Sequence, residues 1–87
     1  VAFRTVATAP LLHLRARQGI FQPGDPADVV FEIVEGAVLV EAALGDGRRQ
    51  IIEIARTGAL IGFAAGAVQT LSAETLAPTL VRPITRA

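Results

Sequence analysis

The chain has 87 residues with eight arginines, no lysine and eight acidic residues, so its formal net charge is zero and gives no support to nucleic-acid binding. It contains no cysteine, which excludes disulfides, thiol chemistry and iron–sulfur ligation by cysteine, and its single histidine, His13, cannot build a metal site alone. Although 52% of the residues are hydrophobic, no apolar run approaches a membrane span and the N-terminus lacks the apolar core of a signal peptide, so we expect one small cytoplasmic domain without a membrane partner.

Eight short segments have the residue pattern of β-strands. Apolar and β-branched side chains recur in short runs, and Gly, Pro or Asp separates many of these runs. We expect strands at residues 11–17, 19–22, 28–35, 37–43, 48–55, 59–61, 71–76 and 79–85. Residues 1–9 are expected to form a further strand or an arm. Pro83 predicts that the last strand lies at a sheet edge or ends early, because proline cannot donate to a ladder.

The strongest local signal is a hairpin over residues 31–55. Its two β-branched runs meet at Gly45-Asp46-Gly47, and a tight hairpin turn needs residues that tolerate positive φ. Gly36 divides the first run and favours a bend or bulge. Residues 48–49, both arginine, predict a solvated face beside the tip. Four glutamates on the strands are expected to point outward or to pair with arginines across strands: Glu32, Glu35, Glu41 and Glu53.

Residues 63–70 differ from the rest of the chain, because they are rich in Ala and Gly and show no alternation. They predict one helical turn or a loop. Short strands at close spacing, joined by Gly, Pro and Asp turns, are typical of an antiparallel sandwich or jelly roll. We therefore predict an all-β antiparallel jelly-roll sandwich or barrel with one short helical turn.

Four glycine-containing phrases occur in order along the chain. They are Gly19-Ile-Phe-Gln-Pro-Gly-Asp25, Val30-Phe-Glu-Ile-Val-Glu-Gly36, Gly45-Asp-Gly-Arg-Arg-Gln-Ile51 and Thr57-Gly-Ala-Leu-Ile-Gly62. Together they resemble the cyclic nucleotide-binding-like sensor domain of the CRP/FNR superfamily of bacterial transcription regulators. The resemblance covers about residues 12–86, and the glycines suit a jelly roll because they turn without a Cβ penalty.

The resemblance implies a phosphate-binding segment after the last of these glycines. In nucleotide-binding members, a Glu directly after the glycine contacts the ribose, an Arg near the end of the segment contacts the phosphate, and a short helical turn presents its amides. Here Phe63 stands in place of the Glu and Leu71 in place of the Arg, whereas Ser72 and Ala73 match. The resemblance thus implies weak or no binding of cyclic AMP or cyclic GMP, because a buried phosphate diester without a cation is costly.

The candidate ligand-binding residues follow from the same segment. They are Gly62, Phe63, Leu71, Ser72 and Ala73. Any effector is expected to be a small molecule of unknown identity, and no cofactor is expected. The phrase Ser72-Ala73-Glu74 after an apolar segment is similar to the FixK and FNR-type branches. Oxygen sensing through a cysteine-bound iron–sulfur cluster, as in FNR, is excluded because the chain has no cysteine.

The resemblance also implies partners for a longer parent protein. In the family, a long helix after this domain forms a homodimer, and a helix-turn-helix domain then reads DNA. The chain stops at Arg86-Ala87, before either element. We therefore expect one cyclic nucleotide-binding-like domain over residues 1–87, a homodimer in the full-length parent, and DNA contact only through a domain missing here.

Two other functions stay open. A degenerate jelly-roll interaction domain would keep the fold and lose the ligand. A cupin-like small-molecule-binding protein or enzyme would need several histidines and a glutamate as metal ligands, and one histidine disfavours it. The sequence gives no basis for a Ser, His and Asp catalytic triad, so we expect no enzyme. We expect His13 to lie on the polar side of its strand, at the surface.

Overall fold

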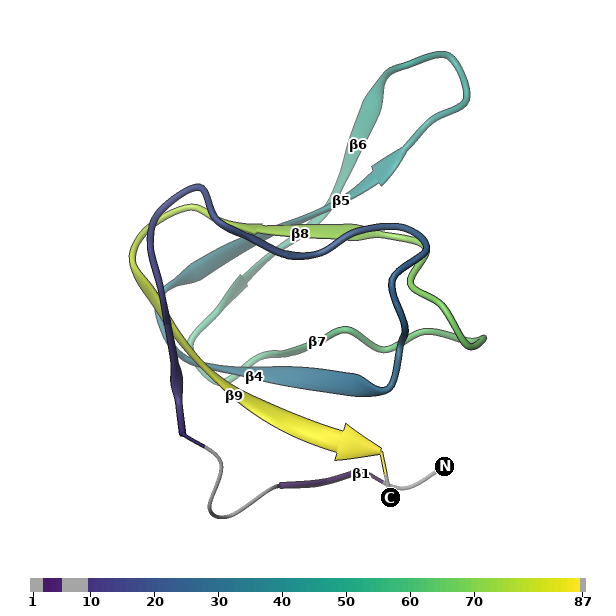
Figure 1. The fold of residues 1–87 in the computed structure, drawn as a ribbon. Helices are drawn as coiled ribbons and strands as arrows, with labels where there is room; N and C mark the ends of the chain where they lie inside the picture. The colour runs from purple at the N-terminus through teal and green to yellow at the C-terminus, as the bar shows by residue number, and fades with distance from the viewer. Residues whose placement is uncertain (1–2, 6–9, 87) are drawn as a thin grey trace.

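The computed structural model describes residues 3–5 and 10–86 as two antiparallel β-sheets that pack face to face (Figure 1). The strands are β1 (Phe3–Thr5), β2 (Leu12–Leu14), β3 (Gly19–Phe21), β4 (Val29–Glu35), β5 (Ala37–Ala43), β6 (Arg49–Arg56), β7 (Leu60–Ile61), β8 (Ser72–Thr75) and β9 (Thr79–Arg86). Sheet A has the order β1-β9-β4-β7 with β2 also paired to β9, and sheet B has the order β3-β8-β5-β6. The predicted all-β jelly roll is confirmed, and each predicted strand is present.

The core lies between the two sheets. Alternation along each strand sends every second side chain inward, so that register partners from neighbouring strands meet there. Ile33 of β4 pairs with Val81 of β9 in sheet A, and both are 0% exposed. The buried cluster consists of Phe21, Ile33, Val38, Val40, Ala55, Ile61, Ala73 and Val81.

The last strand is the centre of sheet A. β9 pairs with β4 on one side and with both β1 and β2 on the other, so the prediction that Pro83 marks an edge or an early end is wrong. Its partners explain how the proline is accommodated. The register with β2 covers residues 79–81 and the register with β1 covers residues 84–86. Pro83 therefore faces neither of these strands, and only β4 pairs with it there, at Phe31.

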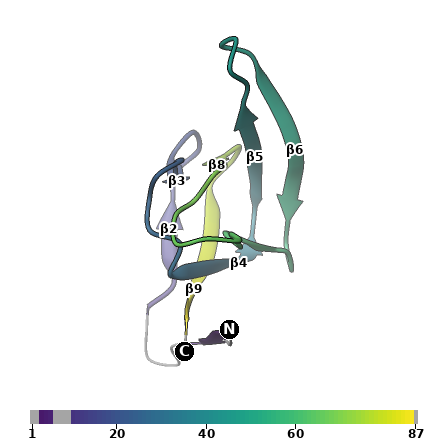
Figure 2. The ribbon, with the colours of Figure 1, turned by 90° about the vertical axis from the view of Figure 1, so that its right-hand side faces the viewer.

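The β5–β6 hairpin projects beyond the other strands in both views (Figures 1 and 2). Its turn is closed by a hydrogen bond from Leu44 N to the Arg48 carbonyl oxygen at 2.8 Å. Among the described strands only β5 pairs with β6, and the register of this ladder shifts between Val40 and Glu41, as at a β-bulge. Along β6 only Ala55 is buried. The composition of residues 48–55 predicted a strand here, but because the hairpin projects from the sheets most of β6 is exposed to solvent.

The base of this hairpin is a tight corner between β4 and β5. Gly36 has φ +124°, and a Cβ added there would lie 2.8 Å from the Thr79 Cα of β9. The Thr79 hydroxyl donates to the Ala77 carbonyl oxygen at 2.8 Å. The predicted bend at Gly36 is therefore confirmed, and it lets the chain cross from sheet A to sheet B in contact with the start of β9.

The N-terminal region departs in part from its prediction. Residues 3–5 form β1, while the remainder of the expected strand or arm at residues 1–9 lies outside the described residues. The strand expected over residues 11–17 is confined to β2, in which Leu12 is 40% exposed. The chain turns after β2 with Arg17 at φ 62°, and the Arg17 amide donates to the Thr75 carbonyl oxygen at 2.9 Å. This turn ends β2 early.

Candidate functional site

The segment between β7 and β8 is extended, and it lies against the loop between β3 and β4. Residues 65–67 are bends, and no helical turn is present among the described residues, so the predicted turn at residues 63–70 is wrong in its helical form. Three backbone hydrogen bonds of 2.8–2.9 Å hold the two loops together: Gly24 N to Gln69 O, Gln69 N to Asp25 O, and Ala27 N to Ala67 O. The segment contributes the Gln69 amide and the carbonyl oxygens of Ala67 and Gln69 to these bonds, so these backbone groups are satisfied by the other loop and not by a helical turn. The described residues likewise contain no helix that could cross a membrane.

Gly62 fixes the start of this segment. Its φ is +100°, and an added Cβ would lie 3.2 Å from the Val29 carbonyl oxygen, so a side chain there would be both strained and crowded. The side chain of Gln69 is 3% exposed and donates from Nε2 to the Gly62 carbonyl oxygen at 2.8 Å. Gln69 was not singled out from the sequence, yet it joins the two ends of the segment.

The structure separates the candidate ligand-binding residues. Phe63 is 57% exposed, beside the buried strand end at Ile61. Leu71 is partly buried and packs against the core. Ser72 and Ala73 begin β8, where Ser72 pairs with Glu41 and Ala73 with Val40. The segment after Gly62 thus leaves Phe63 largely exposed and packs Leu71 against the core.

A cleft of about 300 Å³ lies at the start of β8. Its lining residues are Gln22, Pro23, Glu41, Ala43, Arg49, Ser72, Ala73 and Glu74. Of the candidate ligand-binding residues, it contains only Ser72 and Ala73. The polar groups available to a ligand are therefore a hydroxyl, an amide, two carboxylates and one guanidinium.

The charges of this cleft oppose an anionic ligand. The Glu41 side chain is 18% exposed, and the Arg49 guanidinium lies 3.5 Å from its carboxylate. Glu74 adds a second carboxylate, so the lining carries two negative charges against one positive charge that already has a partner. A phosphate brought to Ser72 would meet net repulsion at short range. No three acidic or histidine side chains of the described part gather so that they could hold a metal ion.

Sequence reasoning missed most of the cleft. The sequence predicted Glu41 to point outward or to pair with an arginine, placed Glu74 in the phrase Ser72-Ala73-Glu74, and predicted a solvated face at Arg49, but it assigned none of the three to a cleft. Arg49 does pair with Glu41, as expected for a cross-strand partner, and Arg48 pairs with Asp46 at 2.6 Å. The predicted hairpin brings β5 and β6 together. Ser72 and Glu74 join Glu41 and Arg49 only because β8 pairs with the other side of β5, and no local sequence signal gives that pairing.

Comparison with known proteins settles the family. Residues 11–87 match the family model described as the cyclic nucleotide-binding domain. The chain belongs to this family. Its relatives include the nitrogen fixation regulation protein FixK of Rhizobium meliloti, which is 35% identical over 60 residues, and the transcriptional activatory protein AadR of Rhodopseudomonas palustris, which is 35% identical over 66 residues. Both relatives are CRP/FNR-type transcription regulators, in agreement with the resemblance seen in the sequence.

A solved relative has the same fold. The structure of FixK2 from Bradyrhizobium japonicum superposes with a TM-score of 0.81 at 34% identity and covers 91% of this chain. This cyclic nucleotide-binding domain spans only part of each relative. The region aligned with FixK covers 69% of the present chain and the region aligned with AadR covers 74%, but each is 28% of the relative's own length. The region aligned with FixK2 is 40% of the FixK2 chain.

Proposed function

We propose that this domain is the sensor module of a CRP/FNR-type transcription regulator and that it works without binding cyclic nucleotide. The observation that carries the proposal is the pair Phe63 and Leu71, which stand where the family-type segment has a ribose-binding Glu and a phosphate-binding Arg. The placement of Leu71 against the core supports it, because no cation takes over that position. Glu41 and Glu74 beside Ser72 add repulsion toward a phosphate.

The proposal extends to the parent protein. We infer a cytoplasmic homodimer that contacts DNA through a separate domain, because the relatives are named as regulators of transcription and of nitrogen fixation. The domain itself would have no catalytic role. Any effector would be a small molecule other than a cyclic nucleotide.

Calorimetric titration of the 87-residue chain with cyclic AMP, repeated with cyclic GMP, tests the proposal. We expect no saturable heat at high micromolar protein. A matched double variant, Phe63→Glu with Leu71→Arg, restores the family charges, and a thermal melt checks that it folds. Saturable binding to the unaltered chain, with a dissociation constant tighter than about 0.1 mM (about 5.5 kcal/mol), would show that the segment works without Glu and Arg.

The second candidate function is a degenerate jelly-roll interaction domain. One observation favours it, since Ile51, Ile52 and Ile54 are 59%, 49% and 44% exposed on the edge strand β6. Large apolar side chains gathered at one edge are typical of a protein-binding surface. The coding sequence of the parent separates the two candidates. A long helix followed by a helix-turn-helix would favour the regulator, and the lack of both would favour the interaction domain.

A further inference from the structure

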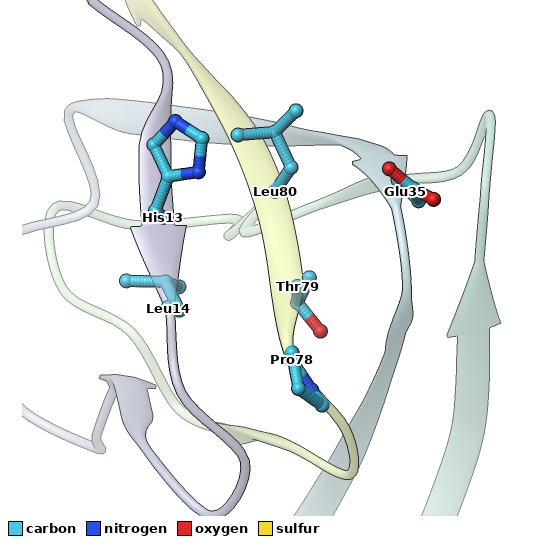
Figure 3. A pocket seen from close by; sticks show the side chains of 6 residues that line it. All are labelled: His13, Leu14, Glu35, Pro78, Thr79 and Leu80. Atoms are coloured by element: carbon cyan, nitrogen blue, oxygen red, sulfur yellow. The ribbon is translucent and has the colours of Figure 1, made fainter.

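A second cavity, of about 320 Å³, lies on sheet A, away from the segment discussed above. It is lined by His13, Leu14, Glu35, Pro78, Thr79 and Leu80. Figure 3 shows these side chains on the neighbouring strands β2, β9 and β4 and, for Pro78, on the turn before β9, with Leu80 on the middle strand β9. Its volume falls at the lower end of the range of small-molecule sites in proteins.

The strand register sets the two polar groups of this cavity on either side of one leucine. His13 of β2 and Glu35 of β4 are both register partners of Leu80. Leu80 sits between the buried residues Thr79 and Val81, so it points to the outer face of sheet A. His13 shares that face by register, and a register shift between Ile33 and Glu35 places the exposed Glu35 opposite Leu80 in the same cavity lining. Because neighbouring strands lie about 4.8 Å apart, the backbones that carry His13 and Glu35 stand about 10 Å from each other, and we take this as the span between the two polar groups.

A neighbouring pair of residues across β4 and β9 has the ion pair that His13 and Glu35 lack. There Arg82 Nε lies 3.1 Å from the Glu32 carboxylate, and the two charges satisfy each other directly. Among the described residues, neither His13 nor Glu35 takes part in an ion pair or a side-chain hydrogen bond. The cavity therefore presents the imidazole of His13 and the carboxylate of Glu35, separated by the apolar side chain of Leu80.

We propose that this cavity binds a small linear ω-amino carboxylate. Its ammonium group would pair with the Glu35 carboxylate, its carboxylate would accept a hydrogen bond from the His13 ring, and its methylene chain would lie on Leu80. Subtracting two hydrogen bonds of about 2.8 Å from the span of about 10 Å leaves about 4–5 Å between the ligand's nitrogen and its nearest carboxylate oxygen. A chain of three methylenes covers that distance, so 4-aminobutanoate is the probe.

A titration followed by amide and imidazole NMR shifts tests the proposal on the 87-residue chain. With 4-aminobutanoate we expect saturable shifts at the cavity residues and none at the tip of the β5–β6 hairpin. Glu35→Gln should weaken binding by about fivefold, since one ion pair is lost. Glu32→Gln is the matched control, because Glu32 lies on the same face but does not line the cavity, and it should leave binding unchanged.

Three results would overturn the proposal. They are equal affinity of the Glu35→Gln variant, shifts spread evenly over the chain, and butylamine binding as tightly as 4-aminobutanoate, which would remove any role for His13. Both substituted glutamates are at least partly exposed, so loss of folding is not expected, and a thermal melt verifies it. Because this cavity is separate from the cleft at Ser72, the outcome is independent of the cyclic nucleotide titration.

Discussion

Strands β6 and β9 have the same length, eight residues each, and both are rich in β-branched side chains. β9 has three partner strands and carries the fully buried Val81, whereas β6 has one partner strand and buries only Ala55. The difference shows that burial follows the position of a strand in its sheet. Composition makes both segments strands, but the partners decide which one stabilises the fold.

The glycine at the base of the β5–β6 hairpin gives the largest expected effect. Gly36→Ala forces a side chain into a φ of +124° and against the Thr79 backbone of β9, so we expect a loss of about 3 kcal/mol in the free energy of unfolding. Urea unfolding followed by circular dichroism measures it. Gly47→Ala at the hairpin tip is the control, where φ is +87° but the space is open, and about 1 kcal/mol is expected. Equal losses would mean that contact with β9 does not matter.

Truncating a side chain on each strand tests the comparison directly. Val81→Ala in β9 leaves a cavity in the core and should cost about 2.5 kcal/mol of unfolding free energy. Ile51→Ala in β6 removes more atoms from a side chain that is 59% exposed, and it should cost less than about 0.5 kcal/mol. Chemical denaturation of both variants decides the point. A larger loss for Ile51 would show that β6 packs against a surface in solution.

The hydroxyl of Thr75 anchors the turn after β2. It is 0% exposed and accepts a hydrogen bond from the Gln18 amide at 2.9 Å. Thr75→Val keeps the shape but leaves that amide without an acceptor, so we expect a loss of about 2 kcal/mol. Thr75→Ser keeps the hydroxyl and should lose less. If valine proved the milder substitution in thermal unfolding, the methyl packing would outweigh the hydrogen bond.

The smallest expected change in unfolding free energy is at the ion pair between Arg82 and Glu32 in sheet A. Arg82 and Glu32 each have 37% of the side chain exposed, so a double-mutant cycle with alanine should give a coupling energy of about 0.5 kcal/mol. This coupling should shrink as salt is added, because the pair is screened. A coupling that is large and independent of salt would contradict this assignment as a solvated pair.

Turn residues made the strand order along the chain predictable, since the hairpin at Gly45-Asp46-Gly47 and the bend at Gly36 each act locally. The errors concern partners distant in sequence. Pro83 is accommodated by the gap between β1 and β2, and the expected helical turn is replaced by bonds to residues 24–27. Of the candidate ligand-binding residues, only Ser72 and Ala73 line the cleft at the start of β8, and its charged lining was not predictable because strand register brings it together.

The central place of β9 in sheet A also governs the order in which the chain can fold during synthesis. β1, β2 and β4 each find their main partner in β9, which begins at residue 79. A ribosome releases the N-terminal strands first, and they cannot close their ladders until the last strand has emerged. Sheet B can pair β5 with β6 and then β8 before that moment. The nascent chain therefore assembles one sheet ahead of the other, and β1, β2 and the β9-facing edge of β4 wait unpaired for the longest time.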